Sequence, residues 1–155
     1  MSDQKRFTVV NLEQLQWPVD VQIPTKRFRL FVAGDISRLT DEAVSSFALS
    51  ALERGMVYFC AWGPDCSRFD DLVDWVCVMD ELDAKRFVGP SQSDVIMTTW
   101  HANDTLEEAL DFFASFAIPT DGFAPDSDFR LVVCLSNPEW ENAANRFLAS
   151  VKFFR

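Results

Sequence analysis

Apolar segments of strand length alternate with amphipathic helical patterns along most of this chain, and this alternation limits the folds that it can adopt. Four such segments each precede a stretch whose apolar residues recur every three or four positions. These segments are 28–33, 56–61, 94–100 and 129–135. Strands that are apolar on both faces and alternate with helices favour right-handed crossovers onto a parallel sheet. The sequence therefore predicts an α/β fold with three layers, α/β/α, around a roughly four-stranded, mainly parallel sheet.

We expect the common strand order 2-1-3-4, with the strands numbered along the chain. Local motifs mark the helix starts in this arrangement. Thr40 is placed to cap the first helix, and Asn137 followed by Pro138 suits the start of the last one. Asp104 and Glu107 have the spacing of a capping box and predict the start of the third helix. The segments 84–93 and 119–128, rich in Gly, Pro, Ser and Asp, are predicted loops.

The first 27 residues follow a different pattern from the rest of the chain. Residues 7–10 have the composition of an additional edge strand, whereas Trp17-Pro18 and Ile23-Pro24 interrupt regular structure. At 155 residues, the chain has the length of one ordinary domain. We therefore expect residues 1–27 to form an extension or an edge strand, and residues 28–155 to form a single α/β domain.

The formal net charge of −10 constrains the class of partner. Residues 1–30 contain five basic and three acidic residues, so the other 125 residues carry a net charge of −12. A surface of this sign repels the phosphates of nucleic acids and of anionic lipids, and it speeds encounter with a basic protein. We therefore expect another protein, of basic character, as the partner, and neither a nucleic acid nor a membrane.

The cysteines and the N-terminus indicate the compartment. The four cysteines form no C-x-x-C pair, which disfavours a zinc ribbon or a thioredoxin-type site. The sequence MSDQKRFTVV lacks the apolar core of a signal peptide, and no apolar run approaches 18 residues. We therefore expect reduced thiols and a cytoplasmic protein.

In an open parallel sheet, ligands bind beyond the carboxyl ends of the strands. The segments that follow the four predicted strands bring polar and aromatic side chains to this rim. The predicted ligand-binding residues are Trp62, Asp65, Thr99, Trp100 and His101. Asp35 and Asn137 join the same rim, although capping alone is enough to explain Asp65, Asp104 and Asn137.

Three residues are candidates for catalysis, namely Cys66, His101 and Asp35. His101 is the only histidine, and beside Cys66 at a helix N-terminus it could generate a thiolate nucleophile. The predicted strand order opposes this pair, because the second and third strands would flank the first and lie about 9–10 Å apart. A structural role for His101 is the alternative. A metal site that includes Cys60 is disfavoured, because Cys60 lies within a predicted strand.

Several signatures of cofactor binding and catalysis are missing from the sequence. Gly34-Asp35-Ile36-Ser37, after the first strand, contains neither a G-x-G-x-x-G nor a P-loop motif. The chain also has no G-x-S-x-G nucleophile elbow. We therefore predict no cofactor and no metal.

Two segments carry a resemblance to a known family. The strings VYFCAWGPDC, at 57–66, and MTTWH, at 97–101, resemble a family of short bacterial proteins described as a domain of unknown function. The similarity runs from about Phe28 to Leu148, and the string CAWGPDC is its most specific part. The resemblance implies a bacterial, cytosolic protein and implies no activity.

Two hypotheses about function remain open. The first is a non-enzymatic interaction or accessory protein, for example an immunity-like protein, with an acidic surface that bears aromatic side chains. It rests on the net charge of −12 on residues 31–155, on Trp62 and Trp100 at the rim, and on the missing cofactor and nucleophile signatures. Asp70, Asp71 and Asp74 lie close together on the second helix, where a solvated face is the first explanation and a docking surface for a basic partner the second. The alternative is a small enzyme or metabolite sensor with its site at the strand rim. A Trp-lined cleft with an ordered contact between His101 and a carboxylate would favour this alternative.

Overall fold

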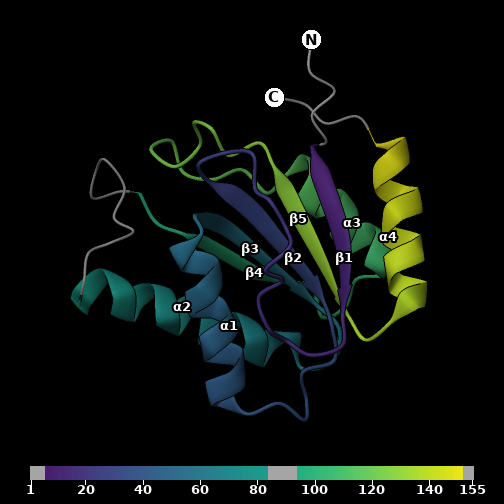
Figure 1. Cartoon of the computed structure of the whole chain (residues 1–155), viewed down its shortest axis with the longest axis horizontal. Coiled ribbons are helices and arrows are strands. Elements are labelled where there is room, and N and C mark those ends of the chain that lie inside the picture. Colours follow the sequence, from purple (N-terminus) through teal and green to yellow (C-terminus); the bar gives the residue numbers. More distant parts are fainter. Residues whose placement is uncertain (1–5, 84–93, 152–155) are drawn as a thin grey trace.

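The computed structural model describes residues 6–83 and 94–151, and these residues form an α/β fold around a five-stranded parallel sheet. The order of the strands is β1-β5-β2-β3-β4 (Figure 1). The strands are β1 (Phe7–Leu12), β2 (Phe28–Ala33), β3 (Met56–Trp62), β4 (Met97–Trp100) and β5 (Arg130–Leu135). The helices are α1 (Asp41–Glu53), α2 (Cys66–Asp83), α3 (Leu106–Ser115) and α4 (Pro138–Ser150).

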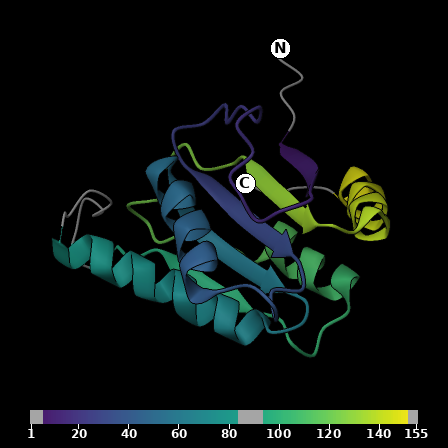
Figure 2. The same cartoon turned by 60° about the horizontal axis from the view of Figure 1, so that its bottom comes forward.

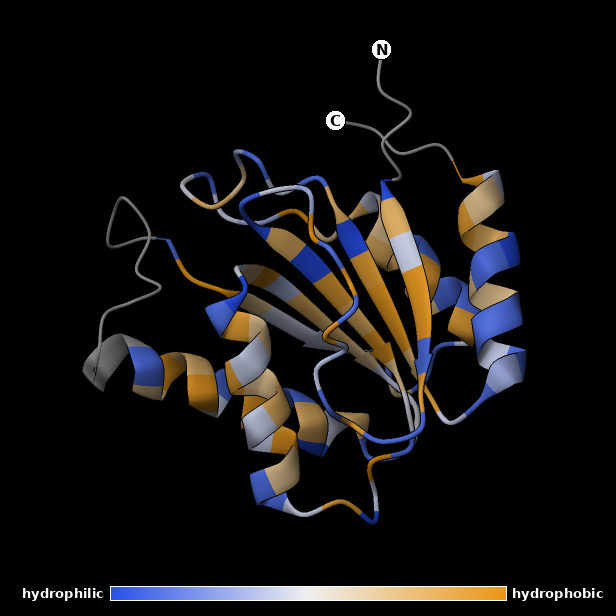
Figure 3. Cartoon of the chain, viewed as in Figure 1, coloured by the Kyte–Doolittle hydropathy of each residue, from blue (hydrophilic) through white to orange (hydrophobic). Residues whose placement is uncertain are grey.

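Helices cover both faces of the sheet, which gives the three predicted layers (Figure 2). On one face, α1 and α2 pack against the sheet through a core that includes Phe47 and Phe69. On the other face, α3 and α4 do so through a second core that includes Phe113 and Leu148. The hydrophobic residues are concentrated along the central strands between these layers (Figure 3).

The predicted strand order 2-1-3-4 is wrong, and so is the predicted number of strands. The last strand, β5, does not lie at an edge: it pairs with β2 on one side and with β1 on the other. The cause is the position of the helices. After β2, the connections through α1 and α2 lie on one face and carry the chain outward to β4. Helix α3 then crosses the opposite face and returns the chain to the free side of β2.

The N-terminal segment supplies the fifth strand. The edge strand predicted over residues 7–10 is present as β1 and extends to Leu12. Its six residues pair in parallel with β5, from Phe7 opposite Arg130 to Leu12 opposite Leu135. The N-terminal segment thus contributes to the same sheet as the rest of the chain.

Two of the three predicted helix starts are confirmed. The side chain of Thr40 accepts a hydrogen bond from the Ala43 amide, and Asn137, with Pro138 at the first turn, accepts one from Trp140. The third prediction is wrong by one residue, because Thr105, not Asp104, caps α3 in a reciprocal box with Glu108. The carboxylate of Asp104 binds His101 instead.

The remaining predictions concern loops and a membrane span. The predicted loop at 84–93 lies outside the described residues. The loop at 119–128 is held by hydrogen bonds from the Gly122 amide to Asp94 (2.8 Å) and from the Lys26 amide to Asp126 (2.8 Å). Within residues 6–83 and 94–151, none of the helices combines the length and the apolar character needed to cross a membrane.

Candidate functional site

The strand order reverses between β2 and β5, so their carboxyl ends mark the topological switch point of the sheet. These strands are neighbours, but α1 leaves β2 on one face of the sheet whereas α4 leaves β5 on the other. A crevice between two such strands is the usual ligand site of an open α/β sheet. A cavity of about 680 Å³ lies at this point, and we call it the switch-point cavity. It is lined by Glu13, Gln14, Leu15, Gln16, Asp35, Leu39, Ala43, Leu135, Ser136, Asn137 and Trp140.

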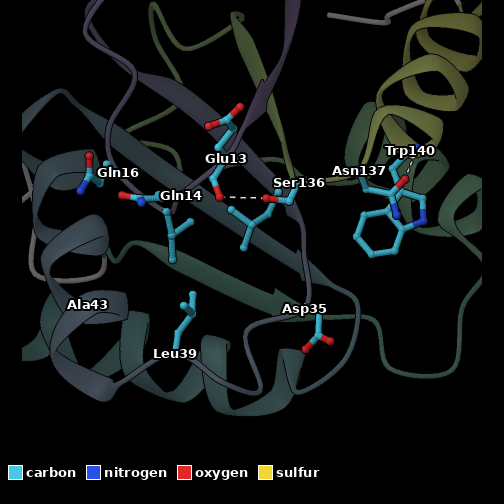
Figure 4. A pocket seen from close by; sticks show the side chains of 11 residues that line it. Glu13, Gln14, Gln16, Asp35, Leu39, Ala43, Ser136, Asn137 and Trp140 are labelled. Carbon is cyan, nitrogen blue, oxygen red and sulfur yellow. Dashed lines mark hydrogen bonds between the residues drawn. The ribbon is translucent and has the colours of Figure 1, made fainter.

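Figure 4 shows that these side chains come from separate segments, and hydrogen bonds after β5 join two of them. Ser136 has a left-handed backbone (φ 51°), which is uncommon for a residue with a side chain. Its amide donates to the carbonyl of Leu12 (2.7 Å) and its hydroxyl to that of Glu13 (2.8 Å). The amide of Asn137 donates to the side chain of Asn11 (3.1 Å). These contacts fix the segment after β1 against the end of β5.

Asp35 is the acidic group that follows β2. Its Oδ1 accepts hydrogen bonds from the amide (2.9 Å) and the hydroxyl (2.6 Å) of Ser37. These bonds hold the pKa of the Asp35 carboxyl below its usual value, so the exposed side chain is ionised at neutral pH. Arg68 supports the same loop from α2, because its guanidinium donates to the carbonyls of Ile36 (2.8 Å) and Leu39 (2.9 Å).

Trp140, on the first turn of α4, forms an aromatic part of the wall. Its ring meets that of Trp62 edge to face, with the centroids 5.1 Å apart. The indole nitrogen of Trp62 donates to the carbonyl of Asp104 (2.8 Å), which fixes the orientation of this second ring. The two tryptophans therefore stand between the switch-point cavity and a second hollow.

The second hollow, of about 380 Å³, lies beyond the ends of β3 and β4. Its lining contains three of the predicted ligand-binding residues and the catalytic candidate Cys66. It is formed by Trp62, Gly63, Pro64, Asp65, Cys66, His101, Ala102 and Asp104. Asp65 lies there next to Arg68, whose Nε donates to its carboxylate at 2.7 Å.

His101 is held by both of its ring nitrogens. Nδ1 lies 2.9 Å from the carboxylate of Asp104, and Nε2 lies 3.0 Å from the hydroxyl of Thr99. The ring also packs on Phe112, with the centroids 4.8 Å apart. Because a carboxylate can only accept a hydrogen bond, Nδ1 carries the hydrogen and Nε2 faces the hydroxyl. Thr99 thus lies behind the histidine and does not line the hollow.

The structure opposes a catalytic Cys66–His101 pair, but for a different reason from the predicted one. The separation of 9–10 Å was expected because another strand was predicted between the two, but β3 and β4 are direct neighbours. The obstacle is that Asp104 and Thr99 already occupy both nitrogens of the imidazole. In addition, burial raises the pKa of the Cys66 thiol, which is 3% exposed, so the thiol keeps its proton at neutral pH.

The structure places five of the predicted site residues at the two hollows and leaves two, Thr99 and Trp100, outside both. Trp62, Asp65, Cys66 and His101 line the second hollow, whereas Asp35 lines the switch-point cavity. Trp100 is 51% exposed at the end of β4 and lines neither. Among the described residues, no group of three or more His, Cys, Asp or Glu side chains is arranged to hold a metal ion.

Most of the switch-point cavity was not predicted from the sequence. Asp35 and Asn137 were predicted at the rim, whereas Gln14, Ser136 and Trp140 were not among the predicted site residues. These residues meet only because β5 inserts between β1 and β2, which the wrong strand order did not allow. The polar run from Glu13 to Gln16, directly after the predicted edge strand, was the pattern that could have indicated a second polar segment at this rim.

Comparison with known proteins gives a family but no activity. Residues 8–151 match the family described as Domain of unknown function (DUF7684). The chain belongs to this family. The DUF7684 match begins at the second residue of β1 and covers all of α4, so it includes the segments that build both hollows. No curated protein and no solved structure matches the chain.

Proposed function

We propose that this protein binds a small molecule in the switch-point cavity. The observation that carries the proposal is the position of a cavity of about 680 Å³ between the ends of β2 and β5, where the helices leave for opposite faces. This volume is within the range of pockets that hold metabolites. The wall combines an ionised carboxylate, Asp35, with side-chain amides and the indole of Trp140. A few polar groups set among apolar ones are typical of ligand sites.

The residues of the second hollow, next to the cavity, favour a binding protein over an enzyme. His101 has both nitrogens occupied, and the thiol of Cys66 is buried and protonated, so neither is prepared to act as a base or a nucleophile. The ordered contact between His101 and Asp104, beside Trp62, instead stiffens the wall that Trp62 and Trp140 share. We therefore propose a ligand-binding or sensor role, in the cytoplasm of a bacterium, where the four free cysteines would stay reduced.

A fragment screen by NMR on the full-length protein tests this proposal. A ligand of the cavity should shift the amide signals of Ser136 and Asn137 and the indole N–H signal of Trp140. Trp140→Ala should abolish binding, whereas Trp75→Ala, which removes an exposed indole on α2, should not. The proposal fails if no fragment or metabolite in the screen shifts the signals of the cavity.

A second candidate function is the docking of a basic protein on α2 and β4. Two indoles are exposed on these elements, Trp75 (61%) and Trp100 (51%), and Asp71 and Asp74 are exposed on the same helix. Acidic residues around exposed aromatic side chains suit a basic partner, as an immunity-like protein would require. A protein captured from lysate at low salt should be lost with Asp74→Lys or Trp75→Ala and retained with Trp140→Ala. Equal capture by all three variants would refute this role.

A further inference from the structure

We infer that the ligand of the switch-point cavity is a small organic cation that carries an ammonium group. This inference rests on the proposed function and specifies its ligand class. It follows from three features of the cavity: the charges in its wall, the capped and acidic N-termini of α1 and α4, and the aromatic ring of Trp140.

The wall of the cavity carries negative charge. Among the described residues that line it, two are acidic, Glu13 and Asp35, and none is Lys, Arg or His. Figure 4 shows the carboxylate of Glu13 directed away from Ser136, and it shows Asp35 on the other side of Ser136. Both hydrogen bonds from Ser37 end on Oδ1 of Asp35, which leaves Oδ2 available to an ammonium donor.

Arg38 and Arg68, near the loop after β2, do not reverse this charge. Arg68 is already bound to Asp41 (2.6 Å) and Asp65 (2.7 Å), as well as to two backbone carbonyls. Arg38 is close enough to Asp35 to help lower the pKa of its carboxyl, but it does not line the cavity. A ligand with a positive charge therefore meets an acidic wall.

The helix N-termini at the cavity are unsuited to a phosphate. Helix N-termini bind anions through free amides and the helix dipole. Here the side chains of Thr40 and Asn137 already accept hydrogen bonds from amides of the first turns of α1 and α4. Each first turn also carries two carboxylates, which repel an anion. They are Asp41 and Glu42 in α1 and Glu139 and Glu141 in α4.

The indole of Trp140 adds an attraction for the same class of ligand. The face of an indole attracts an ammonium group, and this attraction adds to that of a nearby carboxylate. The edge-to-face contact with Trp62 holds the Trp140 ring in place and can cover at most one of its two faces. Asp35, in the loop after β2, and Trp140, on α4, lie on opposite sides of the reversal point, so a ligand between them would contact both halves of the fold.

Three probes of equal chain length and different charge test the ligand class. They are putrescine, butane-1,4-diol and succinate, titrated into the full-length protein at pH 7 and low salt, with agmatine and choline as further cations. We expect at least one cation to shift the Ser136 and Asn137 amides with a Kd below about 1 mM, and the diol and succinate to cause no shift. Asp35→Asn should raise the Kd of the cation at least about tenfold. Asp111→Asn, which removes an exposed charge on α3, should leave it unchanged.

The outcomes separate this inference from the proposed function. A neutral or anionic compound that binds in the cavity, when the three cations do not, overturns the cationic class and leaves the binding function standing. Cation shifts that spread over Asp71 and Asp74 on α2, or an Asp35→Asn protein with unchanged affinity, also overturn the inference. A cavity that responds to none of these probes and to no compound of the wider screen overturns both.

Discussion

Asp70 on α2 is a buried carboxyl group that the fold tolerates at an energetic cost. It is 5% exposed, and its Oδ1 has no hydrogen-bond partner among the described residues. Burial raises the pKa of this carboxyl and outweighs a hydrogen bond with Thr98, which lowers it, and the neighbouring charges of Asp74 and Asp71 raise the pKa further. The folded protein therefore holds the proton of Asp70 more tightly than the unfolded chain does, and the ionised form destabilises the fold.

We expect Asp70→Asn to raise the Tm at pH 7, because the amide removes the buried charge. A gain of about 1 kcal/mol corresponds to roughly 2–4 °C for a chain of this size. As the pH falls through the raised pKa, Asp70 itself becomes neutral, so the advantage of the variant should shrink toward zero. Thermal unfolding from pH 7 to pH 4 measures this difference. The exposed Asp71→Asn serves as the control, and an advantage that grows toward acid pH would contradict the explanation.

Position 63 requires glycine because of its backbone conformation and because of the atoms around it. It has a φ of 117°, and a Cβ at this position would lie 2.2 Å from the carbonyl oxygen of Gly34. We expect Gly63→Ala to lower the free energy of unfolding by about 2–4 kcal/mol, measured in urea. Gly34→Ala is the matched control, because its Cβ would meet only the side chain of Leu135, at 3.0 Å. An equal or larger loss for Gly34→Ala would contradict this account.

Individual residues also show what the sequence can and cannot specify. Thr40 and Asn137 were predicted correctly because a cap depends on a few consecutive residues. Asp104 was assigned to the wrong role because Asp and Thr are both good caps and stand next to each other. The choice between them depends on His101, whose imidazole takes the carboxylate through a contact that forms only in the folded chain.

At the scale of elements, the end of α3 is fixed to the sheet by buried arginine. The guanidinium of Arg29 on β2 donates to the carbonyls of Ala117 (3.0 Å) and Ser127 (3.0 Å), and it is 8% exposed. Arg130, its partner on β5, donates to the carbonyl of Ala114. Burial lowers the pKa of Arg29, but an arginine remains charged at neutral pH. The carbonyls of Ala114 and Ala117 lie at the C-terminal end of α3, where a cation is favoured, and that of Ser127 lies in the loop before β5.

We expect Arg29→Met to cost about 2–4 kcal/mol of stability, because it leaves buried carbonyls without donors. Hydrogen exchange should also accelerate at the amides of Phe116 and Ala117, which donate to Phe112 at the end of α3. Arg146→Met, at an exposed position of α4, controls for the loss of charge. Unchanged exchange at the end of α3 in Arg29→Met would show that this anchor is unimportant.

The elements were predicted better than their arrangement. The limits of β2 were predicted to the residue, and those of β3 and β5 to within one residue, because continuous apolar runs mark buried strands. The prediction of the strand order failed because the order depends on which face each helix covers. One sequence feature did indicate which strand lies at the edge: the segment of β4 contains Thr98 and Thr99, whereas that of β5 is nearly all apolar. The more polar strand belongs at an edge, and the structure places it there.

At the scale of the whole molecule, the uneven charge of the sequence becomes a difference between the two ends of the sheet. Arg27, Arg29 and Arg130 lie where β2 and β5 begin. The opposite end holds Asp35 and the acidic first turns of α1, α3 and α4. The excess of negative charge could be read from the sequence, but its position could not, because it depends on all strands running in the same direction. This polarity suits a cation at the carboxyl ends of the strands.

The four thiols provide a test of the whole fold. Burial raises the pKa of Cys60 on β3 and of Cys134 on β5 to about 12, and both side chains are fully buried in central strands. Because only a thiolate reacts with iodoacetamide, we expect both to be modified at the same slow rate, set by global unfolding. Peptide mapping after timed labelling at several urea concentrations measures this. The unfolded chain, in which all four thiols should react quickly, is the reference. Cys66 should also be protected from labelling. If Cys66 were labelled many times faster than Cys60, it would again be a candidate for an activated nucleophile.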